Sequence, residues 1–169
     1  MNDSAYPLRY ILLVIAQILI WNYCNFSQYA MLTFLPIMIM YTPVNQGYVK
    51  TLLIAFITGF AVDFFSDGML GLTSAALLPV AFFKRGFITM IFGSEVFARE
   101  ETITVQRQGA AKVSLSIILS TALFLALYIW IDGAGTRPFW FNLTKFGISL
   151  GISSIVSFLS IQILESDNR

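Results

Sequence analysis

The run Val113-Ser-Leu-Ser-Ile-Ile-Leu-Ser-Thr-Ala-Leu-Phe-Leu-Ala-Leu-Tyr-Ile-Trp-Ile131 contains no charged side chain. A transmembrane helix needs about 20 predominantly apolar residues, because it must cross a hydrocarbon layer of about 30 Å. The run therefore predicts a membrane-spanning helix over 113–131.

The composition of the whole chain agrees with this prediction. Of its 169 residues, 57% are hydrophobic and 11% are charged, and the mean hydropathy is +0.78. Soluble domains carry about 25% charged residues, because water must solvate their surface. These values exclude an ordinary soluble enzyme, a nucleic-acid-binding protein with a basic face and a disordered chain. The sequence predicts an integral membrane protein that contacts the lipid bilayer and no nucleic acid.

Five further apolar runs predict an all-α, polytopic membrane protein with about six transmembrane helices in a single integral membrane domain over 1–169. Two of the runs contain a proline, Pro36 or Pro79, which either kinks its helix or marks an interruption. The predicted helices are 8–23, 30–41, 51–65, 69–83, 113–131 and 139–164, and 84–112 is predicted to be a cytoplasmic loop.

The basic residues predict the orientation, because cytoplasmic loops are enriched in Lys and Arg. With six crossings and both termini in the cytoplasm, the outer segments hold Arg137, and Lys145 lies just inside the sixth helix, where we expect it to snorkel outward. The first part of the long loop, 87–97, is predicted to be a helix in the membrane interface. Its polar part, 99–109, is either a solvated connector or a docking surface. The inner segments hold Arg9, Lys50, Lys84, Arg85, Arg99, Arg107, Lys112 and Arg169.

The residues available for chemistry are few. The chain has no histidine and one cysteine, Cys24, which excludes an internal disulfide, a thiolate metal cluster and the His-based catalytic and metal sites. Any ionisable chemistry must therefore come from carboxylates, Lys, Arg, Tyr or the lone thiol, and we expect no cofactor and no metal.

The most informative stretch runs from Gly59 to Leu72. A carboxylate inside a membrane helix is costly unless it faces protein or water, so Asp63 is a functional candidate. Ala55, Gly59, Asp63 and Asp67 are four residues apart, and they share one helix face if the helix continues as far as Asp67. Four roles for the two aspartates stay open: capping of helix ends in the hairpin, contact with a partner or ligand, an ion or proton relay, and intramembrane hydrolysis.

The sixth run contains Gly147-x-x-x-Gly151 followed by Ser154, with further serines nearby. Small residues at this spacing allow helices to approach closely. The face is predicted to pack either against helices of the same chain or against another subunit, and the sequence favours neither.

The chain resembles the rod shape-determining MreD family, a small membrane subunit of the bacterial elongasome. The resemblance rests on Gly59-x-x-x-Asp63 followed by Asp67-Gly68-x-x-Gly71-Leu72, and on the basic pair Lys84-Arg85 after the fourth run. It implies a fold similar to the substrate-binding subunits of energy-coupling-factor vitamin transporters.

The resemblance implies a non-catalytic scaffold in the bacterial inner membrane. Such a protein binds the bitopic protein MreC and helps to couple MreB filaments to a RodA-type glycosyltransferase and a class B penicillin-binding transpeptidase. The alternative is a small-molecule-binding subunit of a vitamin-type transporter, for which Asn22, Asn25, Gln28 and Asp63 are candidate pocket residues.

Overall fold

The computed structural model describes residues 5–23, 30–43, 47–66, 69–93, 109–133 and 137–165. Apart from a short extended stretch at 30–34, the regular structure in these ranges is helical. The helices are α1 (Ala5–Tyr23), α2 (Leu35–Met40), α3 (Tyr48–Phe65), α4 (Leu72–Phe92), α7 (Ala110–Asp132) and α8 (Phe139–Glu165).

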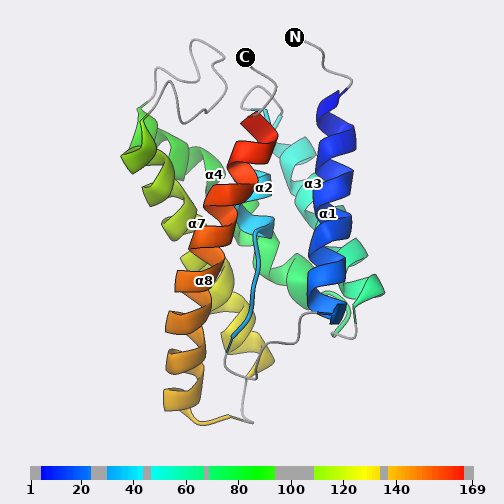
Figure 1. The fold of residues 1–169 in the computed structure, drawn as a ribbon, viewed down its shortest axis with the longest axis vertical. Helices are drawn as coiled ribbons and strands as arrows, with labels where there is room; N and C mark the ends of the chain where they lie inside the picture. Colours follow the sequence, from blue (N-terminus) through cyan, green and yellow to red (C-terminus); the bar gives the residue numbers. More distant parts are fainter. Residues whose placement is uncertain are drawn as a thin grey trace.

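Four of these helices, α3, α4, α7 and α8, are long and apolar enough to cross a membrane. Together with the shorter apolar helix α1, they surround α2, and the start of α1 lies at the same end of the bundle as the end of α8 (Figure 1). Many large apolar side chains point outward, including Leu12, Ile57, Met90 and Ile155, as expected of a surface solvated by lipid. The chain is a polytopic helical membrane protein.

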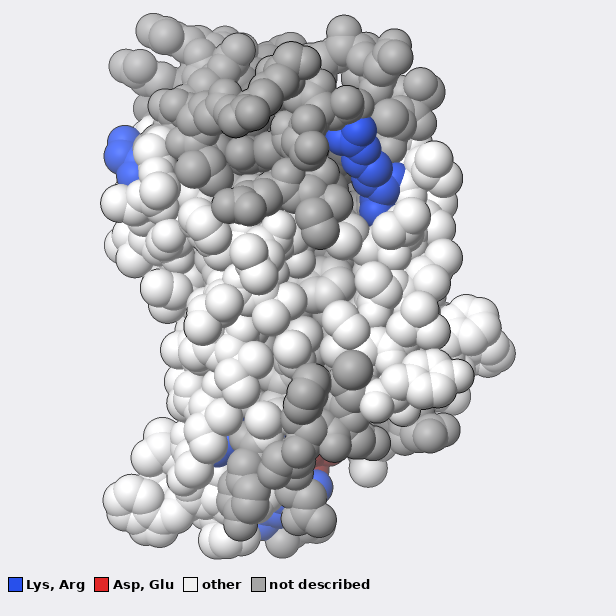
Figure 2. Space-filling model, viewed as in Figure 1, with Lys and Arg blue, Asp and Glu red and all other residues white. Residues whose placement is uncertain are grey.

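The charged side chains visible on one face of the molecule lie toward its two ends (Figure 2). In the view of Figure 2, Lys and Arg side chains gather near the upper end and again at the lower end, and an uncharged belt separates them. This distribution is the one that a lipid-spanning bundle requires, because a charge at the centre of a bilayer is costly.

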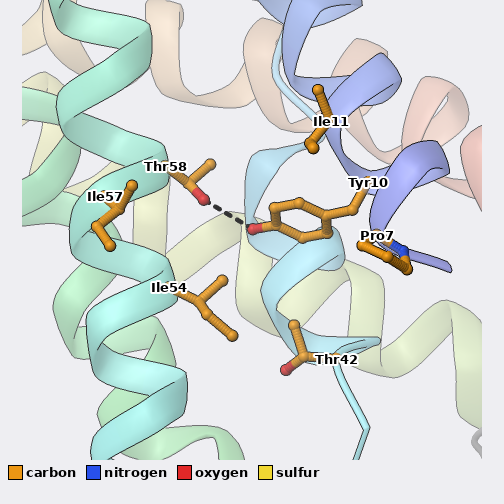
Figure 3. A pocket seen from close by; sticks show the side chains of 7 residues that line it. All are labelled: Pro7, Tyr10, Ile11, Thr42, Ile54, Ile57 and Thr58. Atoms are coloured by element: carbon orange, nitrogen blue, oxygen red, sulfur yellow. Dashed lines mark hydrogen bonds between the residues drawn. The ribbon is translucent and has the colours of Figure 1, made fainter. Parts of the chain in front are cut away.

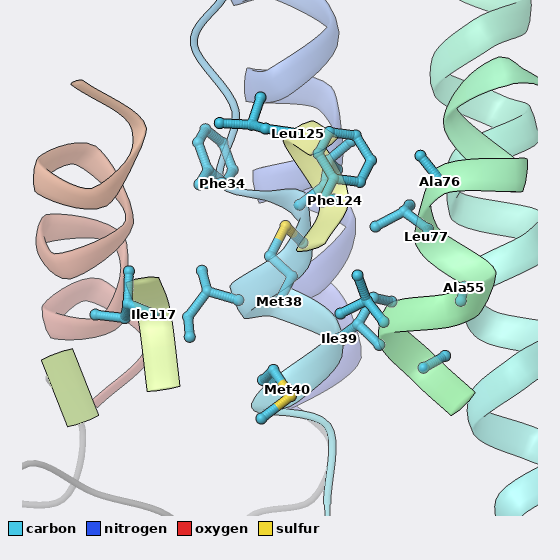
Figure 4. Packing of buried hydrophobic residues seen from close by; sticks show 14 of the residues in the cluster. Phe34, Met38, Ile39, Met40, Ala55, Ala76, Leu77, Ile117, Phe124 and Leu125 are labelled. Carbon is cyan, nitrogen blue, oxygen red and sulfur yellow. The ribbon is translucent and has the colours of Figure 1, made fainter. Parts of the chain in front are cut away.

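The centre of the bundle is the short helix α2, whose six residues are all buried. Met38 and Ile39 lie between Ile117 of α7 on one side and Leu77 of α4 on the other (Figure 4). Pro36 stands in the first turn of α2, where its missing N–H leaves no helical hydrogen bond unmade. The proline therefore begins a helix here instead of kinking one.

The predicted helix over 30–41 is wrong for 30–34, which are extended and lead into α2. Non-helical backbone at membrane depth needs hydrogen-bond partners, because lipid supplies none. Side chains of α8 provide some of them: Ser149 Oγ accepts from Met31 N (2.8 Å), and Ser153 Oγ accepts from Thr33 N (3.0 Å) and donates to the Met31 carbonyl (3.1 Å).

Side chains of α1 complete the cradle of the extended segment. The amide of Gln17 donates to the Leu32 carbonyl and accepts from Phe34 N, each at 3.0 Å. The indole N–H of Trp21 also donates to the Leu32 carbonyl, at 2.7 Å. The segment 30–34 is therefore held between α1 and α8 by side chains, in place of the hydrogen bonds of a helix.

The fourth predicted helix, 69–83, is longer than expected and ends at Phe92. Lys84, Ile88 and Phe92 are all buried and four residues apart, so the inward face of α4 continues past the basic pair. Lys84 and Arg85 thus lie inside the helix, and residues 87–92 are its last turns instead of part of an interface helix or of the loop. The helix also continues through Pro79. Residues 94–108, which hold the rest of the predicted loop, lie outside the described residues.

We predict that Ser153→Ala destabilises the protein by about 1–3 kcal/mol, because it leaves a buried backbone N–H and a carbonyl of the extended segment without their partner. The control is the neighbouring Ser154→Ala. The Ser154 hydroxyl donates only to Leu150 O of its own helix, so this change should alter stability by less than about 0.5 kcal/mol. Unfolding of both variants in mild detergent measures the difference, and equal stabilities would contradict the role of Ser153.

Candidate functional site

The hairpin of α3 and α4 contains most of the predicted site residues. Gly59 faces α4 at its closest approach: a Cβ atom at this position would lie 2.6 Å from both Cα and N of Ser74. The Ser74 hydroxyl donates to the Phe56 carbonyl one turn earlier in α3, at 3.2 Å. Only glycine permits this contact between the two helices, which places Asp63, one turn further along, beside the start of α4.

Asp63 accepts hydrogen bonds from the second residue of α4. Its side chain is buried, and Thr73 N lies 3.2 Å from Oδ1 and 3.0 Å from Oδ2. The first N–H groups of a helix have no partner inside it, and a carboxylate near them is also favoured by the helix dipole. Asp63 therefore caps α4 from the neighbouring helix. This is the geometry expected if the aspartate caps a helix end in the hairpin.

Gly71 is the residue that precedes α4, and its φ of 89° is left-handed. An L-residue with a side chain adopts this conformation at a cost of about 1–2 kcal/mol. Gly71 thus sets the backbone direction that turns the chain into α4 and brings Thr73 N to Asp63. The other two motif residues, Asp67 and Gly68, lie outside the described residues.

Asn22 of α1 joins the same hairpin. Its side-chain amide donates to the Phe65 carbonyl near the end of α3, at 2.9 Å. Of the four polar residues considered for a ligand pocket, Asn22 and Asp63 are both engaged with the hairpin backbone, while Asn25 and Gln28 lie outside the described residues.

A second polar contact lies at the other end of the bundle. The buried ammonium group of Lys84 donates to the carbonyl of Thr42, at 2.7 Å, and to its hydroxyl. Thr42 follows the end of α2, and its hydroxyl donates to the Ile39 carbonyl at 2.8 Å. Lys84 thus places a positive charge at the carboxyl end of α2, where the helix dipole favours it. Arg85, the other half of the basic pair, is exposed.

Gly147 and Gly151 lie on the outer face of α8. Both are exposed, and a Cβ atom added to either would meet nothing within 4 Å. Within the part of the chain that the structure describes, no other helix packs against these two glycines. Ser154 is half-buried and bonded within α8. The serines of α8 that do face the interior are Ser149, Ser153, Ser157 and Ser160.

Lys145 differs from the expectation that it snorkels outward. Its side chain is buried, and its ammonium group lies 3.5 Å from Oδ2 of Asp132 at the end of α7. The same oxygen is 3.4 Å from Nη1 of Arg137. A carboxylate at the neighbouring helix end makes the inward position favourable for Lys145, and the spacing along the sequence gave no sign of that neighbour.

Two elements of this arrangement were missed by sequence reasoning. The first is the set of side chains that bind the extended segment, Gln17, Trp21, Ser149 and Ser153. The sequence contains one indication of it, because Gln17 and Trp21, like Ser149 and Ser153, are polar residues four positions apart within an apolar run. The second is the inward direction of Lys84. The sequence also contains an indication of it, because the apolar residues Ile88 and Phe92 follow Lys84 at four-residue intervals and share its helix face.

Comparisons of the chain with known protein families, characterised proteins and solved structures find no match.

We predict that Gly59→Ala destabilises the protein by about 1–3 kcal/mol, because the added methyl group must push the Ser74 backbone away. Gly147→Ala is the matched control: it lies in open space, and alanine is the better helix former by about 1 kcal/mol. Thermal unfolding of both variants in detergent tests this difference. Similar melting temperatures for the two variants would show that the close contact between α3 and α4 is not required.

We also predict that Lys84→Met lowers the stability by about 1–3 kcal/mol, because the buried Thr42 carbonyl loses its donor. Arg85→Met, next to it on the exposed side of α4, serves as the control and should change the stability little. Denaturant titration of the two variants in the same detergent compares them. A larger effect at Arg85 than at Lys84 would contradict the assignment.

Proposed function

We propose that this protein is a non-catalytic scaffold of the bacterial cell-elongation machinery, with its multi-pass domain in the inner membrane. In this proposal it binds an MreC-like bitopic membrane protein and helps to couple MreB filaments to the RodA-type glycosyltransferase and its class B transpeptidase. It thereby maintains the rod shape of the cell.

The observation that carries the proposal is the α3–α4 hairpin. Each described residue of the motif that resembles the MreD family has a distinct structural role there. Gly59 allows α4 to approach closely, Asp63 caps the start of α4, and Gly71 turns the chain into α4. A motif built from common membrane residues gains weight when its members act together on one contact. This arrangement supports reading the pattern as a single unit, as the resemblance to the MreD family implies.

The outer face of α8 supports a partner in the membrane. Gly147 and Gly151 stand on it among exposed apolar side chains such as Ile148 and Ile155. Exposed small residues at this spacing suit the close approach of a second transmembrane helix. The bitopic partner in the proposal has one transmembrane helix, which could pack against this face.

The proposed topology has six crossings and cytoplasmic termini. The segment 30–43 would be the second crossing, with its extended half and α2 together replacing one long helix. Lys50 and Lys112, in the first turns of α3 and α7, lie at the end of the bundle where α1 begins, and Lys84 and Arg85 are in the half of α4 nearer to that end (Figure 1). This distribution supports placing that end in the cytoplasm.

Depletion of the protein in its native cells, with microscopy and co-purification of a tagged copy in mild detergent, tests the proposal. We expect the cells to become round and an MreC-like bitopic protein to be recovered. Unchanged cell shape together with recovery of an ATPase-bearing partner would contradict it and favour the vitamin-transporter subunit.

Two variants locate the partner surface. Gly151→Ile adds bulk on the outer face of α8, and we expect it to lower the recovery of the partner about tenfold, a loss of about 1.4 kcal/mol. Ala75→Ile adds bulk at an exposed position of α4 and should leave recovery unchanged. Equal recovery with both variants would exclude the α8 face as the contact.

A further inference from the structure

A crevice with a volume of about 320 Å³ lies between α1 and α3 and reaches Thr42, the second residue after α2. Pro7, Tyr10 and Ile11 of α1 form one wall (Figure 3). The opposite wall is formed by Ile54, Ile57 and Thr58 of α3, and Thr42 closes one end. None of these residues belongs to the motif or to the outer face of α8.

The lining of the crevice is apolar, and its three hydroxyl groups are already engaged. The Tyr10 and Thr58 hydroxyls share a hydrogen bond of 2.9 Å, drawn in Figure 3. The Thr42 hydroxyl donates to the Ile39 carbonyl and accepts from Lys84. The lining therefore offers a polar ligand few hydrogen-bonding groups to compensate for its desolvation. A hydrocarbon chain needs none.

The position of the crevice favours a lipid with a charged headgroup. Ile11 and Ile57 line it and are 56% and 63% exposed, so the crevice opens onto the outer surface, which lipid covers. It lies toward the end of the bundle at which α1 begins, near the basic side chains. The acidic residues whose side chains are described, Asp63 and Asp132, are near the end of α3 and at the end of α7, toward the opposite end.

Lys50 is a basic residue at the end of the crevice wall that α3 forms. It precedes Ile54 by four residues and therefore stands on the same face of α3, one turn closer to the end of the bundle. Its side chain is exposed, and side chains of a helix lean toward its amino end. An ammonium group in that position would meet a phosphate at the membrane surface while the acyl chain extends into the crevice.

We propose that the crevice between α1 and α3 binds one acyl chain of an anionic phospholipid, whose phosphate is bound by Lys50. This site is independent of the scaffold function, and the bound lipid would fill the space that α1 and α3 leave between them.

Photo-crosslinking tests the acyl-chain site. The full-length protein is placed in nanodiscs doped with phosphatidylglycerol that carries a diazirine on one acyl chain. We expect labelling of 7–11 and 54–58 to exceed labelling of the exposed Ile152 and Ile155 of α8 by about tenfold, equivalent to 1.4 kcal/mol. Equal labelling of the crevice and of the α8 face would show ordinary surrounding lipid only and would overturn the proposal.

Variants of α3 add a matched comparison. Ile54→Trp fills the crevice, and we expect it to reduce the labelling of 7–11 to the level of the α8 face. Leu53→Trp adds the same bulk at an exposed neighbour that does not line the crevice, and it should leave the labelling unchanged. Loss of labelling in both variants, or in neither, would contradict the site.

Headgroup selectivity is measured on a protein whose crevice is intact. We expect Lys50→Gln to abolish the preference for phosphatidylglycerol over phosphatidylcholine in the labelling of 7–11. Lys112→Gln removes the same charge at the start of α7, away from α1 and α3, and should preserve the preference (Figure 1). An unchanged preference in Lys50→Gln would refute the phosphate contact.

Discussion

The rest of the structure depends on one constraint, which is that the extended backbone at 30–34 must be hydrogen-bonded without water. Four side chains meet this need: Gln17 and Trp21 from α1, and Ser149 and Ser153 from α8. Each unpaired N–H or C=O group would cost several kcal/mol in lipid. The first and last helices are therefore tied to the same segment, although they are distant in the sequence.

The central helix α2 follows from this arrangement. Because residues 30–34 enter the interior, the six residues after them are surrounded on all sides and bury their apolar side chains almost completely. At the carboxyl end of α2, the buried ammonium group of Lys84 donates to the Thr42 carbonyl. This hydrogen bond gives a basic residue a structural role inside the bundle. The same logic applies at the α3–α4 hairpin, where Asp63 caps a helix that is not its own. In both places a charged side chain in the interior supports the end of a neighbouring helix.

The charged residues in the interior and the exposed residues on the surface thus have different roles. Charged groups in the interior complete the hydrogen bonding of helix ends, and this gives them a structural reason to be buried. Residues that the chain itself leaves uncovered, such as Gly147 and Gly151, are the ones that remain for contacts with other molecules. The scaffold proposal uses the outer face of α8, whereas the lipid proposal uses the crevice between α1 and α3, so the two surfaces do not compete.

The sequence by itself determined that the protein is helical and crosses a membrane, because long apolar runs with few charges have no other stable environment. It also located the long helices, with the largest errors at the start of the second run and at the end of the fourth. Both errors have one cause: local apolar character does not reveal which side chains from elsewhere will meet a segment. Only the tertiary structure decided that 30–34 are extended, because their partners lie on α1 and α8. It alone turned Lys84 and Lys145 inward, since Thr42 and Asp132 are neighbours in space and not in sequence.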